Sequence, residues 1–323
     1  MKTAFAFVSV ALAASFALPG AIGSDYPSRP VRITVGLPVG ETTDLIARIA
    51  ALALRDVFKQ PVVIDNHAGG SGNVAAALVA KTKRDGYTLL FVSSAFAANV
   101  SVFANPVYDP LRDFAAVARV ANVHQILVVP SSTHVRTLAD FIAYVRGNPG
   151  RIVLASGGTG RSSHLAAELM KQRVGALNTL HVPYKGDGLA LVDLLGGHVD
   201  ALIATMPYAY PHIRSGRLKA LAVASLERAS PLPDVPTFAE SGFPGFEAVV
   251  WNGVVAPAGT PYDTIVRLSL ALSQAASAAS VRQKFAALGA EPVRDTPEQF
   301  AGYLRAEVAK WAKVAKASSI ALE

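Results

Sequence analysis

Cysteine is absent from this chain of 323 residues. Disulfide bonds, thiolate metal sites and cysteine-linked lipids are therefore excluded. A basic run with interleaved aromatic residues is also absent, since the lysines and arginines behind the net charge of +7 are scattered along the chain. This scatter argues against a nucleic-acid surface. It leaves a solvated basic surface, which is compatible with a modest attraction for small anions.

Long apolar runs are absent after residue 23, and no later segment reaches the ~18–20 apolar residues that span a bilayer. Residues 1–23, MKTAFAFVSVALAASFALPGAIG, contain Lys2, then an apolar stretch, then small residues. This pattern predicts a secretory signal peptide cleaved before Ser24, and the alternative is an uncleaved membrane anchor. An exported, disulfide-free chain suits a bacterial periplasm, and its length favours two domains over one.

Short apolar runs alternate with longer helical patterns, as where VRITV (31–35) precedes a helical pattern over 44–59. This alternation predicts an α/β fold with mostly parallel sheets covered by helices. Further strands are expected at 62–66, 87–93, 125–130, 151–156, 179–182, 200–205, 218–225 and from Trp251, and helices near 73–82, 137–147, 162–174, 187–195, 208–215 and from Tyr262 onward.

The chain is expected to cross between two α/β units at two places. These are residues 119–125 and the Pro- and Gly-rich residues 226–250. A chain that leaves one unit, builds a second and returns predicts two lobes joined by two hinge crossovers. We expect lobe 1 to contain residues 24–122 and 250–323, and lobe 2 to contain residues 123–249. Ligands bind beyond the carboxyl ends of strands in such sheets, and clefts between lobes are favoured sites.

The loop ASGGTGRSSH (155–164) follows an expected strand and opens an expected helix. Its three glycines allow a sharp turn that brings backbone N–H groups inward, and Ser162 or Ser163 is expected to cap the helix. A helix N-terminus of this kind accepts an anion. The alternative interpretation is an ordinary glycine-rich turn with a serine cap.

A second loop of this kind, GLPVGETTD (36–44), carries an acidic residue in its middle. Its amides and the hydroxyls of Thr42 and Thr43 are expected to face an anion, and Asp44 is expected to cap the helix. Glu41 has two interpretations. It is either a solvent-facing or capping residue, where the helix dipole favours a negative charge, or a selectivity element that faces the pocket.

Common catalytic motifs are missing, including G-x-G-x-x-G, a Walker motif, the nucleophile elbow G-x-S-x-G and zinc-ligand spacing. Ser163 and His164 are neighbours, but they project differently from a helix start, so they do not predict a Ser–His pair. His164 is interpreted as a structural histidine within its own lobe. In HVPYKGDG (181–188), Asp187 is expected to be an N-cap.

Several segments, in this order and spacing, carry a resemblance over essentially the whole mature chain. They include YPSRPVRI (26–33), PVVIDNHAGGSGNVAAALVAKTKRDGYTLL (61–90), GRSSHLAAEL (160–169), HVPYKG (181–186) and LPDVPTFAESGFPGFE (232–247). Together they resemble the Bug-type extracytoplasmic solute receptors, the TctC-like components of tripartite tricarboxylate transporters. The resemblance implies a periplasmic-binding-protein-like fold of type II, whose two α/β lobes close on a small organic solute. In the family this solute is usually a carboxylate, held by amides, hydroxyls and ordered waters.

The resemblance, its departures and the loop positions together give one set of candidate ligand-binding residues. They are Leu37, Gly40, Glu41, Thr42, Thr43, Asp44, Ser93, Ser94, Ser156, Thr159, Gly160, Ser163, Tyr184, Lys185, Ala204 and Trp251. Lys185 is more commonly a solvated residue. Trp251 is interpreted either as hinge packing or as a wall of the pocket.

Three departures from the family pattern that the resemblance supplies matter for the pocket. Its first loop usually reads F-A-P-G-G-G-T-D, but here Leu37 replaces the aromatic residue and Glu41 replaces a glycine. Many relatives have Asp and Asn where this chain has Ala204 and Thr205. The pocket is therefore expected to lose one carboxylate in lobe 2 and gain one in lobe 1. Because like charges repel, we favour a monocarboxylate, an amino-bearing acid or a neutral aromatic amide over citrate-like ligands.

The leading hypothesis is a monomeric periplasmic receptor that delivers a small solute to the membrane components of a tripartite tricarboxylate-type transporter. It predicts lobe closure on the ligand, without catalysis, metal, cofactor or nucleic acid. One alternative is a receptor that signals to a membrane sensor kinase. Another is an exported α/β hydrolase that uses Ser163 and His164.

Overall fold

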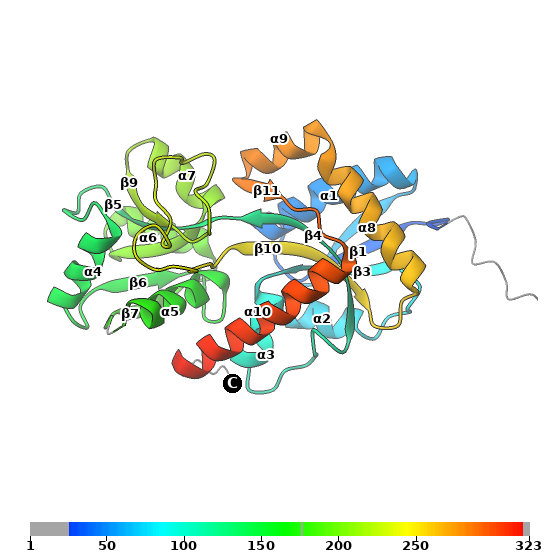
Figure 1. Ribbon diagram of the computed structural model, residues 1–323, viewed down its shortest axis with the longest axis horizontal. Coiled ribbons are helices and arrows are strands. Elements are labelled where there is room, and N and C mark those ends of the chain that lie inside the picture. Colours follow the sequence, from blue (N-terminus) through cyan, green and yellow to red (C-terminus); the bar gives the residue numbers. More distant parts are fainter. Residues whose placement is uncertain (1–25, 176, 319–323) are drawn as a thin grey trace, which may run out of the picture.

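The computed structural model describes residues 26–175 and 177–318, which form two α/β lobes side by side (Figure 1). The expected signal peptide, residues 1–23, lies outside the described residues. The expected strands and helices are present to within a few residues. Four elements are additions that the sequence pattern does not predict, namely the 3-10 helix η1 (Gly70–Gly72), α3 (Ala95–Val102), β4 (Phe114–Val123) and β11 (Ala290–Pro292).

Lobe 1 is built on a six-stranded sheet in the order β11-β4-β10-β3-β1-β2. Besides β4 and β11, its strands are β1 (Val31–Val35), β2 (Val62–Asn66), β3 (Thr88–Ser93) and β10 (Val250–Pro257). Its helices besides α3 are α1 (Thr42–Phe58), the 3-10 helix η1 (Gly70–Gly72), α2 (Asn73–Val79), α8 (Tyr262–Ser277), α9 (Ala279–Ala287) and α10 (Pro297–Ser318).

Lobe 2 is built on a five-stranded sheet in the order β7-β6-β8-β5-β9. Its strands are β5 (Gln125–Pro130), β6 (Val153–Ser156), β7 (Leu180–Pro183), β8 (Ala201–Thr205) and β9 (Leu218–Val223). Its helices are α4 (Leu138–Gly147), α5 (Ser162–Val174), α6 (Asp187–Gly196) and α7 (Met206–Arg214).

The expectation of mostly parallel sheets is wrong, because both sheets are mixed. In lobe 1, β1 pairs in parallel with β2 and β3, whereas β10 runs antiparallel to both β3 and β4. In lobe 2, β6 is parallel to β7 and β8, but β5 is antiparallel to β8 and β9. The strands that carry the chain between lobes cause this difference: β10 enters lobe 1 from lobe 2 and therefore runs against the local βα units.

Two crossings join the lobes, and they lie next to each other (Figure 1). One leads from β4 directly into β5, and the other leads from residue 248 into β10. Gln125 connects them, since its side-chain Nε2 donates to the carbonyl oxygen of Ala248 at 2.6 Å. The backbone carbonyl oxygen of Gln125 also accepts the amide of Ala224 at 2.8 Å. The two-lobed α/β fold with two crossovers is confirmed, while the boundaries at residues 122, 123, 249 and 250 stay a prediction.

The first strand and helix show how local sequence produces the elements around the cleft. In β1 the residues Val31, Ile33 and Val35 lie on one face and are fully buried, and Thr34 on the opposite face is buried as well, as expected for a strand covered on both faces. In α1 the buried residues include Ile46, Ala47, Ala50, Ala51 and Leu54, a stripe with helical spacing. The helix ends at Lys59, which adopts a left-handed conformation with φ 55° and returns its N–H to Arg55.

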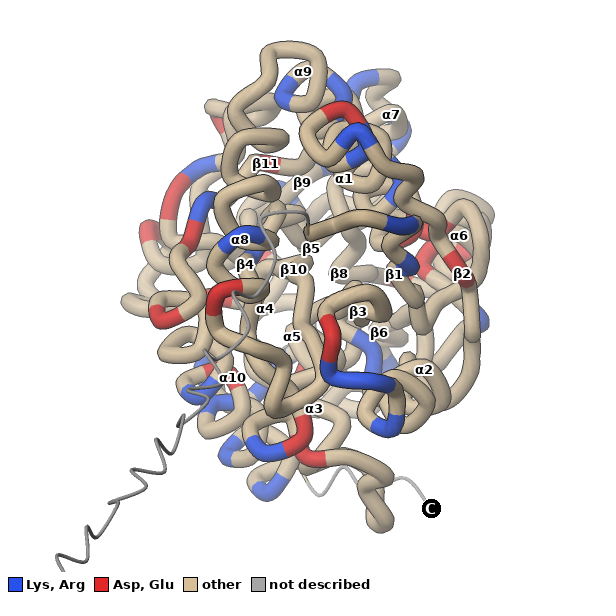
Figure 2. The backbone as a smooth tube through the Cα atoms, turned by 90° about the vertical axis from the view of Figure 1, so that its right-hand side faces the viewer, with Lys and Arg blue, Asp and Glu red and all other residues tan. Residues whose placement is uncertain are grey.

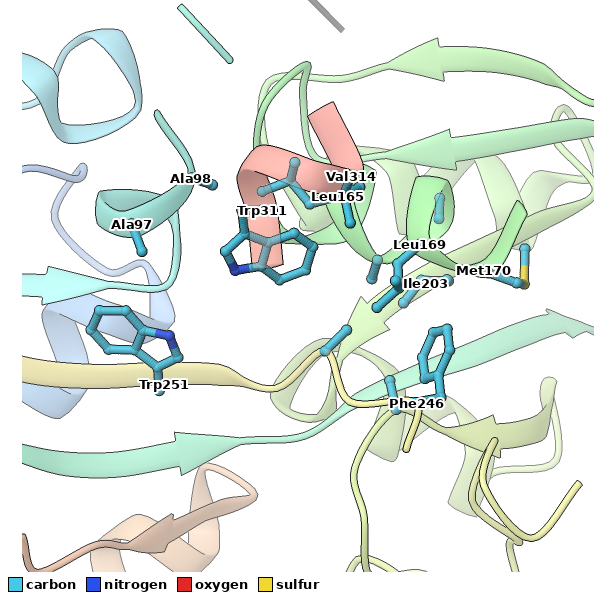
Figure 3. Packing of buried hydrophobic residues seen from close by; sticks show 14 of the residues in the cluster. Ala97, Ala98, Leu165, Leu169, Met170, Ile203, Phe246, Trp251, Trp311 and Val314 are labelled. Atoms are coloured by element: carbon cyan, nitrogen blue, oxygen red, sulfur yellow. The ribbon is translucent and has the colours of Figure 1, made fainter. Parts of the chain in front are cut away.

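Helix α10 packs on α3 and β4 of lobe 1 and also on α5 of lobe 2. Figure 3 shows the shared core, in which Trp311 on α10 lies near Leu165 on α5, while Trp251 on β10 lies on the side of Ala97 in α3. Both indoles are almost completely buried. Because burying a large apolar side chain contributes about 1.5–3 kcal/mol, this cluster stabilises the hinge region as well as the two lobes.

Basic and acidic positions are interspersed over the side of the molecule seen in Figure 2, without a single-sign face. This agrees with the scatter of charge along the sequence. Of the helices that the structure describes, none has both the length and the apolar character that a bilayer crossing requires.

Candidate functional site

A cavity of about 50 Å³ lies between the two lobes. It has room for several water molecules, since one requires roughly 10–15 Å³. Both lobes contribute to its lining, which consists of Leu37, Glu41, Thr42, Thr43, Ser71, Ser93, Ala95 and Val250 from lobe 1 and Arg161, Ser162, Asp187, Thr205 and Tyr208 from lobe 2. The site lies where β3 and β8 end, the position expected for a ligand in open α/β sheets.

Four helices begin at this cavity. Thr42, Ala95, Ser162 and Asp187 are the first residues of α1, α3, α5 and α6, and all four line it. The first N–H groups of a helix have no partner within that helix, and the dipole adds partial positive charge there. At these four described N-termini the cap residue makes no side-chain capping hydrogen bond to the helix. The cavity is therefore surrounded by donors that suit a negatively charged group.

Asp44 holds the first loop in place. Its Oδ2 accepts the amide of Gly40 at 2.8 Å and Nε of Arg48 at 2.9 Å, and its Oδ1 accepts from Asn66 at 2.8 Å. Burial alone would raise the pKa of this carboxyl, but the hydrogen bonds from Arg48, Gly40 and Asn66 outweigh burial and lower it. The expected capping role is wrong, because Asp44 is the third helical residue and binds an amide that precedes the helix.

The glycine-rich loop of lobe 2 uses its amides internally. The N–H of Gly157 donates to Ser163 Oγ at 2.9 Å, and the N–H of Gly158 donates to Ser156 Oγ at 3.2 Å. The N–H of Gly160 donates to His164 Nδ1 at 3.1 Å. The expectation that these glycine amides turn toward an anion is therefore wrong. The expected serine cap is also wrong, because the N-cap of α5 is Arg161 and both serines lie inside the first turn.

Asp187 is the first residue of α6, whose N-cap is Gly186, so its expected capping role is wrong. Its Oδ1 accepts from Ser163 Oγ at 2.9 Å, and its Oδ2 accepts from Thr205 Oγ1 at 3.3 Å. Burial raises the pKa of Asp187, although the nearby Arg161 and the bond from Ser163 oppose the shift. Lobe 2 thus places a carboxyl group at the cavity from a position other than 204 and 205. The expected loss of one carboxylate at Ala204 and Thr205, relative to the family pattern, stays a prediction.

Glu41 points across the cleft. Its carboxylate forms an ion pair with Arg161 of lobe 2, and the two side chains keep only 22% and 24% of their surface exposed. Glu41 is the N-cap residue of α1 but makes no side-chain capping bond. The interpretation of Glu41 as a solvent-facing or capping residue is therefore wrong, and its role in ligand selectivity stays a prediction.

Ser163 and His164 do not form a catalytic pair in this geometry. The Ser163 hydroxyl donates to Asp187, and the His164 ring accepts from Gly160 and stacks on His181 with ring centres 4.1 Å apart. Burial lowers the pKa of His164 to about 4. The expected structural role of His164 within its own lobe is confirmed. Across residues 26–175 and 177–318, no group of three or more His, Asp or Glu residues is arranged to hold a metal ion.

Comparison with known proteins identifies the family. Residues 46–320 match the family described as "Tripartite tricarboxylate transporter family receptor". The chain belongs to this family. It is 40% identical over 300 residues to Protein BugT of Bordetella pertussis, a match that covers 92% of each chain.

Solved structures of family relatives have the same two-lobed fold. The Rhodopseudomonas palustris protein Rpa4515, solved with adipate, has a TM-score of 0.83 and 37% identity, covering 92% of this chain and 100% of its own. MatC from the same organism, with bound malate, has a TM-score of 0.79 and 32% identity, covering 89% and 99%. The resemblance to Bug-type receptors and the type II fold are thereby confirmed.

Within this family receptor, the candidate residues fall into three groups. Those that line the cavity are Leu37, Glu41, Thr42, Thr43 and Ser93. Those that do not line the cavity but form hydrogen bonds within the loops around it are Gly40, Asp44, Ser156, Gly160 and Ser163.

The remaining candidates lie outside the described lining of the cavity. Tyr184 donates its hydroxyl to Asp193 at 2.5 Å, and Lys185 is exposed. Ala204 and Trp251 are fully buried, so Trp251 serves hinge packing. The two others in this group are Ser94, which is buried, and Thr159.

Sequence reasoning missed several lining residues, above all Arg161, Thr205 and Tyr208. Thr205 has a usable signal, because it ends an expected strand. Arg161 lies between the glycines and serines of a loop that was recognised, but nothing local indicates that its side chain reaches the other lobe. Tyr208 lies on α7, where the sequence gives no signal for the cleft.

Proposed function

We propose that this receptor captures a small organic carboxylate between its lobes and delivers it to the membrane components of a tripartite tricarboxylate-type transporter. The observation that carries the proposal is the convergence of four helix N-termini from both lobes on one cavity. Such ends favour anions without a cationic side chain for each oxygen. The relatives solved with adipate and malate hold acids of this class.

The geometry suggests how the carboxylate is held. Its oxygens accept from the first-turn N–H groups of α1 and α5 and from the hydroxyls of Thr42, Thr43 and Ser93. A ligand that bonds to both lobes at once interacts more strongly with the closed arrangement than with an open one. It therefore shifts the population toward closure.

Export and the lack of catalysis belong to the same proposal. We propose that residues 1–23 direct the chain to the periplasm, and that the mature receptor acts as a monomer without a cofactor. Family membership supports a binding role, and the Ser163 hydroxyl is engaged by Asp187 and not by an imidazole.

The direct test is titration of the mature chain with a panel of mono- and dicarboxylates, followed by calorimetry and thermal unfolding. A ligand at a hundred times its Kd adds about 2.7 kcal/mol of stability, which raises the Tm by roughly 5–10 °C. We expect one ligand per chain. Failure of every acid to bind would refute the proposal.

A matched pair of variants tests whether the ligand binds in this cavity. Thr43→Val removes a hydroxyl from the cavity, and a lost hydrogen bond to a charged group weakens binding by roughly tenfold. Thr88→Val makes the same change in β3 of lobe 1, outside the cavity lining, and is expected to leave the affinity unchanged. Equal affinities for the two variants would place the ligand elsewhere.

A further inference from the structure

The charges of the cavity wall are unbalanced. Among the described residues that line it, Arg161 is the one cationic side chain, whereas Glu41 and Asp187 supply two carboxyl groups. Arg161 is already paired with Glu41, and the Asp187 oxygens already accept from Ser163 and Thr205. No lining cation is therefore left over for a ligand, within the part of the chain that the structure describes.

The Glu41–Arg161 pair lies against two loops of lobe 2. Glu41 leaves the N-terminus of α1 and reaches lobe 2, where its Oε1 lies 3.6 Å from the point at which a Cβ on Gly186 would stand. The stem of Arg161 lies closer still to its own loop, since a Cβ on Gly158 would lie 3.2 Å from the arginine Cδ. The carboxylate and guanidinium thus form part of the wall that closes the cavity, and they are not free surface groups.

We propose that Glu41 occupies, on Arg161, the position that the second carboxylate of a dicarboxylate ligand would take, so that this receptor selects acids with a single carboxylate and an uncharged tail. The inference rests on the proposed function and names the ligand class for the same site. Glu41 and Arg161 act as specificity-determining residues, and the first carboxylate binds at the helix N-termini described above.

A dicarboxylate has two ways to enter, and both are unfavourable. If its second carboxylate displaces Glu41 from Arg161, the Glu41 carboxylate remains in the wall without its partner, which is strongly unfavourable for a largely buried charge. If Glu41 keeps Arg161, the second carboxylate lies beside two acidic side chains and is repelled. An uncharged tail avoids both effects. Discrimination then arises from repulsion of the wrong ligand as well as attraction of the right one.

The test uses acids that differ only at the end remote from the first carboxylate. Hexanoate, 6-aminohexanoate and adipate form one series, and butyrate, 4-aminobutyrate and succinate form a shorter one. Calorimetry on the mature chain gives Kd for each acid. We expect both monocarboxylates with uncharged tails to bind at least about tenfold tighter than the matching dicarboxylates, the lower end of what a close interfacial charge pair is worth.

Variants of Glu41 and Arg161 test whether this pair causes the preference for monocarboxylates. Glu41→Gln keeps the shape and removes the charge, so it frees Arg161 and is expected to shift the dicarboxylate-to-monocarboxylate affinity ratio by about tenfold or more toward the dicarboxylate. Glu41→Gly is a second version of the same test should the glutamine retain a hydrogen bond to Arg161. The double variant Glu41→Gln with Arg161→Gln should lose that gain. Thermal melts verify that each variant is folded.

Glu240→Gln is the matched control, because it neutralises a glutamate in an exposed ion pair with Arg228 of lobe 2. It is expected to leave every ratio unchanged. Tighter binding of dicarboxylates by the wild type, or an unchanged ratio in both Glu41 variants, would overturn the selectivity and leave the receptor function intact. Tightest binding of the amino acids would instead assign Glu41 to a ligand ammonium and also overturn it. No binding of any acid by wild type and variants would overturn the proposed function and this inference together.

Discussion

Trp251 on the hinge strand β10 donates its indole N–H to Oε2 of Glu307 on α10, at 2.8 Å. The same oxygen accepts the indole N–H of Trp311 at 2.9 Å, and Glu307 is only 3% exposed. One buried carboxylate therefore links the strand that returns from lobe 2 to the helix that packs on both lobes. The neighbouring Lys310 pairs with the other carboxylate oxygen and balances its charge.

Glu307→Ala is expected to lower the free energy of unfolding by about 2–4 kcal/mol, because it leaves two buried indole donors without an acceptor. Glu307→Gln retains an acceptor oxygen and should cost less. Urea unfolding followed by tryptophan fluorescence measures both. Arg305→Ala, at an exposed position of the same helix, is the control and should stay within about 0.5 kcal/mol of the wild type. Equal losses in Glu307→Ala and Arg305→Ala would contradict the linking role of the carboxylate.

Because His164 is buried, we expect the free energy of unfolding to fall in mild acid. Burial, assisted by His181 and Lys171 and opposed by Glu168, lowers its pKa from 6.5 to about 4 in the folded chain. The unfolded chain therefore binds a proton that the folded chain does not, and stability falls as the pH drops from about 6.5 toward 4. The contribution is at most about 3 kcal/mol.

His164→Asn removes this titration and keeps an acceptor for the Gly160 amide. Urea unfolding at pH 7.5 and 4.5 should therefore show a smaller difference for this variant than for the wild type. His134 is exposed and stacks edge-on against Tyr144, so His134→Asn should keep the full pH dependence. A wild-type slope in His164→Asn would show that other groups cause the loss of stability.

The fold was predictable where the signal is local. Apolar runs such as VRITV and helical stripes such as that of α1 are fixed by neighbours in sequence, so their positions agree to within a few residues. The direction of β10 was not predictable, since it depends on the strands it meets after the chain has passed through lobe 2. The mixed character of both sheets follows from such tertiary pairing.

The cavity was predictable as a place, but its chemistry was only partly so. Strand ends and helix starts located both loops, and Glu41 stood out as an unusual residue. Its orientation depends on Arg161, 120 residues away in the chain, which no local pattern can indicate. The glycine-rich loop shows the same limit. Its sequence allows the amides to face the cavity, but in the folded chain they donate to Ser156, Ser163 and His164.

Gly157 provides a test of how lobe 2 builds its side of the cavity. A Cβ at this position would lie 2.3 Å from Asp187 Oδ1 and 2.9 Å from the Asp187 backbone nitrogen. Gly157→Ala must therefore push the N-terminus of α6 outward and break the 2.9 Å bond between Ser163 and Asp187. Because overpacking of this kind costs roughly 1–3 kcal/mol, we expect lower stability in urea and weaker carboxylate binding by calorimetry.

Gly147→Ala is the matched control, since a Cβ at the end of α4 meets nothing within 4 Å. Alanine is the better helix former by up to about 1 kcal/mol, so this variant should be neutral or slightly more stable and should bind carboxylates as the wild type does. If Gly157→Ala matched Gly147→Ala in both stability and affinity, the close approach of the loop to Asp187 would have no part in forming the site. A loss of affinity confined to Gly157→Ala would instead assign the position of the α6 N-terminus a direct part in holding the ligand.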